Sequence, residues 1–159
     1  MKISITKDFD VIARLNKPVH DLHCELYPNY FNKFNNNEMK EVFKKLMRNE
    51  AHYFLLLQEN SEAVGYAWFE IKNYIDNPFK KGYTSVYIHQ ISIIEEKRNM
   101  GYGSSVMEHI YRIAINKGID LIELDYWYKN SSAKAFYRKH GFLKYREFVY
   151  RKLTSNISP

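Results

Sequence analysis

Two glycines and an arginine lie between a β-branched run and a helical pattern, in the segment Arg98-Asn99-Met100-Gly101-Tyr102-Gly103-Ser104. Glycine lacks a Cβ atom, so the backbone can turn sharply and point several N–H groups into one hollow at the start of a helix. The helix dipole and the charge of Arg98 would attract phosphate to that hollow. A plain strand-to-helix turn explains the same glycines. The segment is neither a Walker loop, because no Gly-Lys-Ser/Thr follows, nor a dinucleotide fingerprint, because Val106 stands at the third glycine.

A second cluster follows the next apolar run, in the segment Asn130-Ser131-Ser132-Ala133-Lys134-Ala135-Phe136-Tyr137-Arg138-Lys139-His140-Gly141-Phe142. Asn130 stands where it can cap a helix, and its amide could also bind a ligand. Ala133 is small and allows close approach. Tyr137 follows Asn130 by about two helical turns, and its hydroxyl is a possible proton donor. Capping and packing also explain each residue taken singly.

Together the two clusters resemble the GNAT superfamily of acyl-coenzyme A-dependent N-acetyltransferases. The resemblance rests on Ile91-Ser92-Ile93, Arg98-x-x-Gly101-x-Gly103 and Asn130-x-x-Ala133-x-x-Phe136-Tyr137-x-x-x-Gly141-Phe142. The order and intervals of these residues match the family over residues 83–153. The pair Asn99-Met100 departs from the pattern, in which a glycine and a basic residue are common. The resemblance implies an enzyme that uses acetyl-coenzyme A and needs no metal.

The resemblance also implies where the coenzyme would lie. The sheet of the family splays between its fourth and fifth strands, here 84–94 and 121–128, and the pantetheine arm enters the gap. The coenzyme-binding residues would be Ile91, Ser92 and Ile93 on the strand, Arg98, Asn99, Met100, Gly101, Tyr102, Gly103 and Ser104 in the loop, and Asn130, Ala133, Phe136, Tyr137 and Lys139 across the gap. Lys134 and Arg138 are alternatives to Lys139 for the ribose phosphate, and a solvated helix face explains these cations equally well.

The reaction expected from the resemblance is direct transfer of an acetyl group to a primary amine. A neutral amine attacks the thioester carbon, and a strand N–H, that of Ile91, stabilises the charge on the carbonyl oxygen. Tyr137 would protonate the departing thiolate.

The group that accepts the proton of the amine has two candidates. His89 lies two residues before Ile91 and would share its side of an ideal strand, and a histidine is a suitable acceptor near neutral pH. Glu70 on the adjacent strand is the second candidate. Alternatively, His89 is a hydrogen-bonded histidine that only shapes the pocket. A relay through water would require neither His89 nor Glu70 as the base.

The acceptor amine would enter from the opposite mouth of the gap, which is lined by the first third of the chain. Four aromatic residues there, Tyr27, Tyr30, Phe31 and Phe34, would contact a small, partly enclosed amine such as an amino acid, a polyamine or an amine-bearing antibiotic. Ordinary packing is the other explanation for these rings. The alternatives for the whole protein are a protein or peptide N-acetyltransferase and a non-catalytic acyl-coenzyme A sensor.

The elements that position these residues follow from the hydrophobic pattern. Asp8 can cap a first helix, which Pro18 interrupts or restarts. The expected strands span 1–6, 52–58, 64–74, 84–94, 121–128 and 142–153, and the later helices begin at 37, after 103 and at 131. This order predicts an α/β (α+β) fold with a mixed, mostly antiparallel sheet of the GNAT type flanked by helices. The last strand carries Tyr145, Phe148 and Tyr150, which could form a homodimer interface or belong to the core.

Composition limits the function classes. A chain of 159 residues suits one domain, here 1–153 with a tail at 154–159. One cysteine excludes an internal disulfide scaffold and a zinc site of two or more cysteines. The net charge of +6 favours an anionic partner, but the basic residues are spread along the chain, which favours a local phosphate site over nucleic acid. With no long apolar run and no secretion signal, the sequence predicts a cytoplasmic protein without a membrane partner.

Overall fold

A computed structural model describes residues 1–153 of the protein, so the tail predicted at 154–159 lies outside the described residues. A five-stranded sheet runs in the order β1-β2-β3-β4-β5, and only the β4–β5 pair is parallel. The predicted fold class is therefore confirmed. The strands are β1 (Lys2–Ile5), β2 (His52–Glu59), β3 (Glu62–Tyr74), β4 (Tyr83–Ile93) and β5 (Ile122–Leu124).

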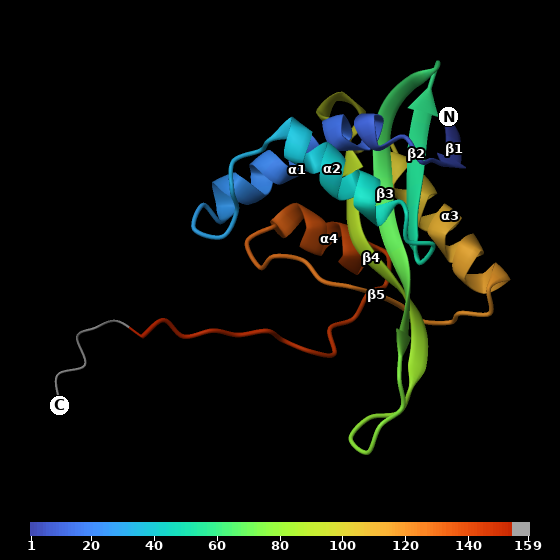
Figure 1. Ribbon diagram of the computed structural model, residues 1–159, viewed down its shortest axis with the longest axis vertical. Helices are drawn as coiled ribbons and strands as arrows, with labels where there is room; N and C mark the ends of the chain where they lie inside the picture. Colours follow the sequence, from blue (N-terminus) through green and yellow to red (C-terminus); the bar gives the residue numbers. More distant parts are fainter. Residues whose placement is uncertain (154–159) are drawn as a thin grey trace.

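Helices cover both faces of the sheet (Figure 1). On one face α1 (Phe9–Leu26) and α2 (Asn36–Leu46) bury Ile12 and Phe43 against Phe54 and Tyr66. On the other face α3 (Tyr102–Asn116) packs with α4 (Ser131–Lys139), and a short 3₁₀ turn, η1 (Glu95–Lys97), precedes α3. Within the described residues, no helix has both the length and the apolar character that a membrane span requires.

The first helix does not break at Pro18, contrary to the sequence prediction. The helix α1 runs through this proline without interruption. A proline removes the N–H that would bond the carbonyl four residues earlier, that of Arg14. Packing compensates, because α1 buries Ile12, Ala13 and Leu15, and the buried Ser92 hydroxyl of β4 donates to the Leu15 carbonyl at 3.1 Å.

The strand β4 contains a bulge at His89. On β3, Trp68 pairs with Gln90 and Phe69 pairs with Ile88, so no β3 residue pairs with His89. An extra residue in one strand shifts the alternation of its side chains. His89 and Gln90 therefore both face α1 and α2, where His89 stacks on Trp68 and Gln90 bonds Asn16, while Ile91 packs into the opposite core. The expectation that His89 and Ile91 share a side is wrong for this reason.

The strands β4 and β5 diverge soon after they pair. Only Val86, Tyr87 and Ile88 have partners on β5, and β5 ends at Leu124, four residues before the end of the predicted strand 121–128. On its other edge β4 stays paired with β3 as far as Ile93. The result is a sheet that is open on one side of β4, from the bulge to the end of the strand.

The last predicted strand, 142–153, is absent from the described structure. These residues follow α4 as an extended chain without a strand partner, and the segment runs away from the body of the molecule (Figure 1). The side chains of Leu143, Phe148 and Val149 are largely exposed. The hydrophobic pattern predicted extended backbone correctly but could not show that no strand of the same chain lies beside it.

Candidate active site

The open edge of β4 presents backbone groups of Ile91 and Ile93. The N–H of Ile94 donates to the Val64 carbonyl of β3 at 3.0 Å, and the Ser92 carbonyl lies against Gly65 of β3. Because backbone groups alternate between the two edges of a strand, those of Ile91 and Ile93 point toward the gap beside β5. The Ile93 carbonyl there accepts from Arg98 Nε at 3.1 Å. Ser92 differs, since its side chain is committed to α1.

The loop before α3 contains two left-handed residues, separated by Met100. Asn99 has φ +60° and Gly101, the N-cap of α3, has φ +86°. Glycine adopts this conformation without strain and asparagine tolerates it, which explains how Asn99 can stand where the family pattern commonly differs. No side chain caps α3 at Gly101, so N–H groups of its first turn remain for an outside acceptor. This arrangement suits a phosphate.

Gly103 serves a different purpose from Gly101. It lies inside α3, and a Cβ atom there would meet the Phe136 ring of α4 at 2.9 Å. The missing side chain therefore allows α3 and α4 to approach closely. Both glycines were expected to curl the loop, but only Gly101 has the left-handed backbone that this role requires.

Other side chains of the loop and of α4 have partners within the protein. Tyr102 is buried, and its hydroxyl bonds Glu59 at the end of β2. Ser104 Oγ lies 3.1 Å from His140 Nε2 at the end of α4. Asn130 caps α4 by accepting from the Ala133 N–H at 3.0 Å, which uses only the oxygen of its amide. Met100 is exposed.

Tyr137 is buried on α4 and faces the segment after β5. Its ring stacks on Tyr126, with centroids 6.2 Å apart, and packs edge-on against Phe142. Burial and the negative charge of Asp125 raise the pKa of the Tyr137 phenol. The phenol is therefore protonated at neutral pH.

His89 and Glu70, predicted separately, lie together. His89 Nε2 is 3.5 Å from Glu70 Oε2, is buried, and has no hydrogen-bond partner in the described residues. Burial lowers the pKa of His89, and the Glu70 carboxylate opposes this only in part. Burial by itself would raise the pKa of Glu70, but the hydrogen bond of Lys72 and the nearby positive charges lower it. At neutral pH the pair is therefore a neutral imidazole beside a carboxylate.

Two residues that the sequence analysis missed complete this cluster. His52 Nε2 lies 3.3 Å from the same Glu70 oxygen, and Trp68 Nε1 donates to His52 Nδ1 at 3.1 Å. Trp68 also stacks on His89 with centroids 4.2 Å apart. Both residues share the cluster's face of the sheet at strand spacing of two, since His52 pairs with Glu70 across the strands. The alternation of β2 and β3 could have indicated them.

The atoms of His52, Glu70 and His89 lie close enough to hold a metal ion, within 4.8 Å of one another. Two histidines and a carboxylate are a donor set that zinc accepts. The Trp68 bond opposes that use, because an Nδ1 that accepts a hydrogen bond requires the proton of neutral His52 to be on Nε2. A metal would need the Nε2 lone pair. The hydrogen bonding therefore favours proton sharing over metal binding.

The predicted aromatic group contacts an unpredicted partner, Trp127, in the segment after β5. Trp127 lies 4.6 Å from Tyr27, 5.7 Å from Tyr30 and 5.0 Å from Phe31, measured between ring centroids. Phe34 is separate and packs against His20. We use the name aromatic group for Tyr27, Tyr30, Phe31 and Trp127. It joins the loop between α1 and α2 to the far side of the gap beside β4.

Asp125 links the two sides of that gap. Its carboxylate accepts from the Tyr87 hydroxyl at 2.5 Å, and Tyr87 lies beside His89 with centroids 5.0 Å apart. Asp125 also acts electrostatically on Tyr137. Among the basic candidates on α4, Lys134 lies over the Tyr128 ring, while Arg138 and Lys139 occupy the last turn.

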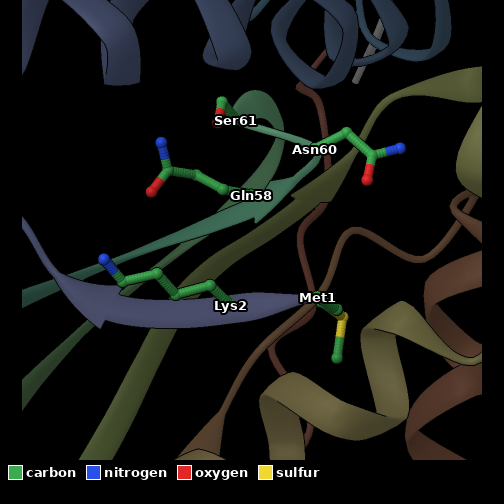
Figure 2. Close-up of a pocket in the computed structure, with 5 residues that line it drawn as sticks. All are labelled: Met1, Lys2, Gln58, Asn60 and Ser61. Carbon is green, nitrogen blue, oxygen red and sulfur yellow. The ribbon is translucent and has the colours of Figure 1, made fainter.

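An open hollow also lies at the N-terminal edge of the sheet. Met1, Lys2, Gln58, Asn60 and Ser61 line it (Figure 2). None of them is a predicted site residue, and Gln58 lies toward the opposite end of β2 from His52. The hollow contains no acid–base pair comparable to His89 and Glu70.

Comparisons with known proteins agree with this geometry. A protein from Bacillus halodurans, BH1408, solved as a point variant, shares 24% identity at a TM-score of 0.90, over 97% of this chain and all of that one. An aminoglycoside 6'-N-acetyltransferase from Acinetobacter haemolyticus, AAC(6')-IG, shares 14% identity at a TM-score of 0.73, over 98% of this chain and all of that one.

A third solved structure is the aminoglycoside N-acetyltransferase AAC(6')-Iy in complex with coenzyme A. It shares 16% identity at a TM-score of 0.68, over 95% of this chain and 93% of that one. These likenesses concern the fold. A family model, described as the acetyltransferase (GNAT) family, matches residues 17–142. The open edge of β4, the uncapped start of α3 and this match lead to one conclusion: the chain belongs to the GNAT acetyltransferase family.

Proposed function

We propose that the protein is an N-acetyltransferase that moves an acetyl group from acetyl-coenzyme A to a primary amine of a small molecule. The observation that supports this most strongly is the open edge of β4. It offers the backbone of Ile91, which packs in the same core cluster as Tyr137 of α4, and His89 of the bulge lies two residues earlier on the same strand. Acetyl-coenzyme A would supply an activated thioester there.

The coenzyme would be held by backbone groups more than by side chains. Ile91 and Ile93 offer strand groups to an amide-bearing arm, and the first turn of α3 after Gly101 offers N–H groups to a pyrophosphate. The remaining N–H groups of Arg98 add positive charge, since only its Nε is bonded to Ile93. Lys139 or its neighbours on α4 would contact a ribose phosphate.

Glu70 and His89 would act together on the amine. With the His89 proton on Nε2 facing Glu70, the Nδ1 lone pair is left to accept the proton that the amine loses. The lowered pKa of His89 keeps this lone pair available at neutral pH. His52 and Trp68 hold the carboxylate and the imidazole in place from behind.

At the other end of the reaction, the Ile91 N–H would stabilise the developing oxyanion and Tyr137 would donate its proton to the leaving thiolate. The phenol of Tyr137 is protonated at neutral pH, so its proton is present before transfer; its raised pKa makes it a weak acid, and the thiolate must form beside it to take the proton.

A small acceptor fits the aromatic group better than a long peptide does. Tyr27, Tyr30 and Phe31 close around Trp127, and the Lys129 N–H donates to the Tyr27 hydroxyl at 2.8 Å, which ties the loop across the gap. A cluster of aromatic rings that meet tilted or edge-on can bind an apolar body or an ammonium group. The solved aminoglycoside acetyltransferases of the same fold make amine antibiotics one class to test.

The test is a screen of amino acids, polyamines, aminoglycosides and short peptides with acetyl-coenzyme A, following release of the free thiol. We expect turnover with at least one small amine, and loss of that turnover in a His89→Ala, Tyr137→Phe double variant. Turnover with peptides alone would replace the small-molecule acceptor with a protein one. Tight binding of acetyl-coenzyme A with no turnover on any amine would favour a sensor.

A further inference from the structure

One carboxylate contacts both ends of the loop before α3. Glu59 is the last residue of β2, and its side chain pairs with Lys97 of η1 and accepts from the Tyr102 hydroxyl of α3. The segment 98–101 lies directly between Lys97 and Tyr102. It contains the two left-handed residues of the loop, and it begins and ends beside the same side chain.

Both contacts of Glu59 are of kinds that hold neighbouring elements together. The side chains of Lys97 and Glu59 are 30% and 28% exposed, so water screens this pair less than a pair at the open surface. Tyr102 is buried in the core, which fixes the position of its hydroxyl. The hydrogen bonds from Lys97 and Tyr102 lower the pKa of Glu59, so the carboxylate is ionised at neutral pH. A hydrogen bond to an ionised acceptor is stronger than one between neutral groups.

The loop itself has residues that do not impose its conformation. Asn99 has a left-handed backbone, which residues other than glycine adopt rarely, although asparagine tolerates it. Gly101 is free to adopt many other conformations when the chain is released. Contacts from outside the segment are therefore needed to keep the N–H groups at the start of α3 in one arrangement.

We propose that Glu59 is a positioning residue for coenzyme A, which holds the loop before α3 in the conformation that accepts the pyrophosphate. The inference rests on the proposed use of acetyl-coenzyme A. The apparent affinity of a site falls in proportion to the fraction of the protein that is in the binding conformation. Loss of the Glu59 contacts lowers that fraction and removes no group that would contact the coenzyme.

The charge of Glu59 separates positioning from a simple electrostatic effect. A carboxylate near a pyrophosphate repels it, so removal of the charge alone would tighten the binding of coenzyme A. Positioning predicts the opposite sign, because Glu59→Gln breaks the ion pair with Lys97 and weakens the bond from Tyr102. Tyr102→Phe changes no charge and removes the second contact, so it should weaken binding as well.

The first experiment is calorimetry of the full chain with coenzyme A at one ionic strength. We expect Glu59→Gln to raise the dissociation constant about tenfold or more, and Tyr102→Phe to raise it too. Glu50→Gln is the matched control, since it removes the same charge from an exposed side chain just before the other end of β2, and it should not raise the constant. Wild-type protein that does not bind coenzyme A would refute the proposed function and this inference together. Binding by the wild type, with equal or tighter binding by Glu59→Gln, would overturn the positioning role alone.

The second experiment distinguishes the loop from the rest of the fold. Without ligand, amide hydrogen exchange across 98–104 should be faster in Glu59→Gln than in the wild type, while exchange in β3 stays the same. S-acetylpantetheine carries the thioester and its arm but no pyrophosphate, so Glu59→Gln should use it as well as the wild type does. With acetyl-coenzyme A the same variant should show a raised KM and an unchanged kcat. An equal loss with both donors, or unchanged exchange in the loop, would mean that Glu59 does not position it.

Discussion

Replacing Glu70 with glutamine is expected to lower the pKa of His89. The acid limb of the pH–rate profile should then move to lower pH. The substitution keeps the size of the side chain and removes its negative charge, which sits 3.5 Å from His89 Nε2. That charge raises the pKa of His89 against the effect of burial, so its loss leaves burial unopposed. The rate kcat/KM rises with pH as His89 loses its proton, so the limb must move to lower pH.

The size of the shift can be bracketed from the geometry. Both side chains are mostly buried, with exposed fractions of 23% for His89 and 14% for Glu70. Two unit charges about 4 Å apart interact by about 1 kcal/mol in water and about 4 kcal/mol at the effective dielectric constant of a protein surface. Since about 1.4 kcal/mol corresponds to one pKa unit, we expect a shift of about one to three units.

Lys72→Met provides the matched control, because its effect has the opposite sign. Lys72 lies 3.2 Å from Glu70 Oε1, and its positive charge lowers the pKa of His89. Its removal should therefore raise that pKa and move the limb to higher pH. The assay is kcat/KM against pH for one amine, with NMR titration of His89 as an independent readout. If the two variants move the limb in the same direction, or Glu70→Gln leaves it in place, His89 is not the base.

The other predictions concern separate parts of the site. Tyr137→Phe should lower kcat by about 10²–10⁴ and leave acetyl-coenzyme A affinity unchanged in calorimetry, since only a proton donor is lost; an unchanged kcat would remove Tyr137 from the mechanism. Gly103→Ala should destabilise the protein by about 1–3 kcal/mol in denaturant unfolding, because its Cβ would meet Phe136 at 2.9 Å, and Phe136→Leu should restore part of the loss. Lack of any rescue would place the strain elsewhere. Trp127→Ala should raise the KM for the amine and leave that for acetyl-coenzyme A unchanged, and the reverse pattern would separate the aromatic group from the acceptor.

The sequence predicted the elements that depend on local pattern. The strands β2, β3 and β4, the cap at Asp8 and the left-handed turn at Gly101 all follow from neighbouring residues. Local pattern was insufficient at Pro18, because packing of the rest of α1 and the Ser92 hydroxyl stabilise a helix that the proline alone would interrupt.

The candidate site was predicted residue by residue but not as an arrangement. The position of His89 two residues before Ile91 and the position of Glu70 on the adjacent strand indicated each residue separately. Their contact depends on the strand register, in which Tyr87 pairs with Glu70, and this register cannot be read from spacing. Trp127 was missed for a related reason. It lies outside the regular part of its predicted strand, and only the folded chain brings it to Tyr27.

The bulge at His89 determines which face of the sheet each later residue of β4 occupies. If the same sequence paired regularly, without the bulge, Gln90 and Ile91 would exchange faces. The amide of Gln90 would then enter the core that Ile91 now fills, and Asn16 of α1 would lose one of its two partners. The extra residue thus sets the orientation of every later position in the strand: loss of the unpaired residue would keep these orientations, whereas loss of a residue farther along β4 would reverse those that follow it.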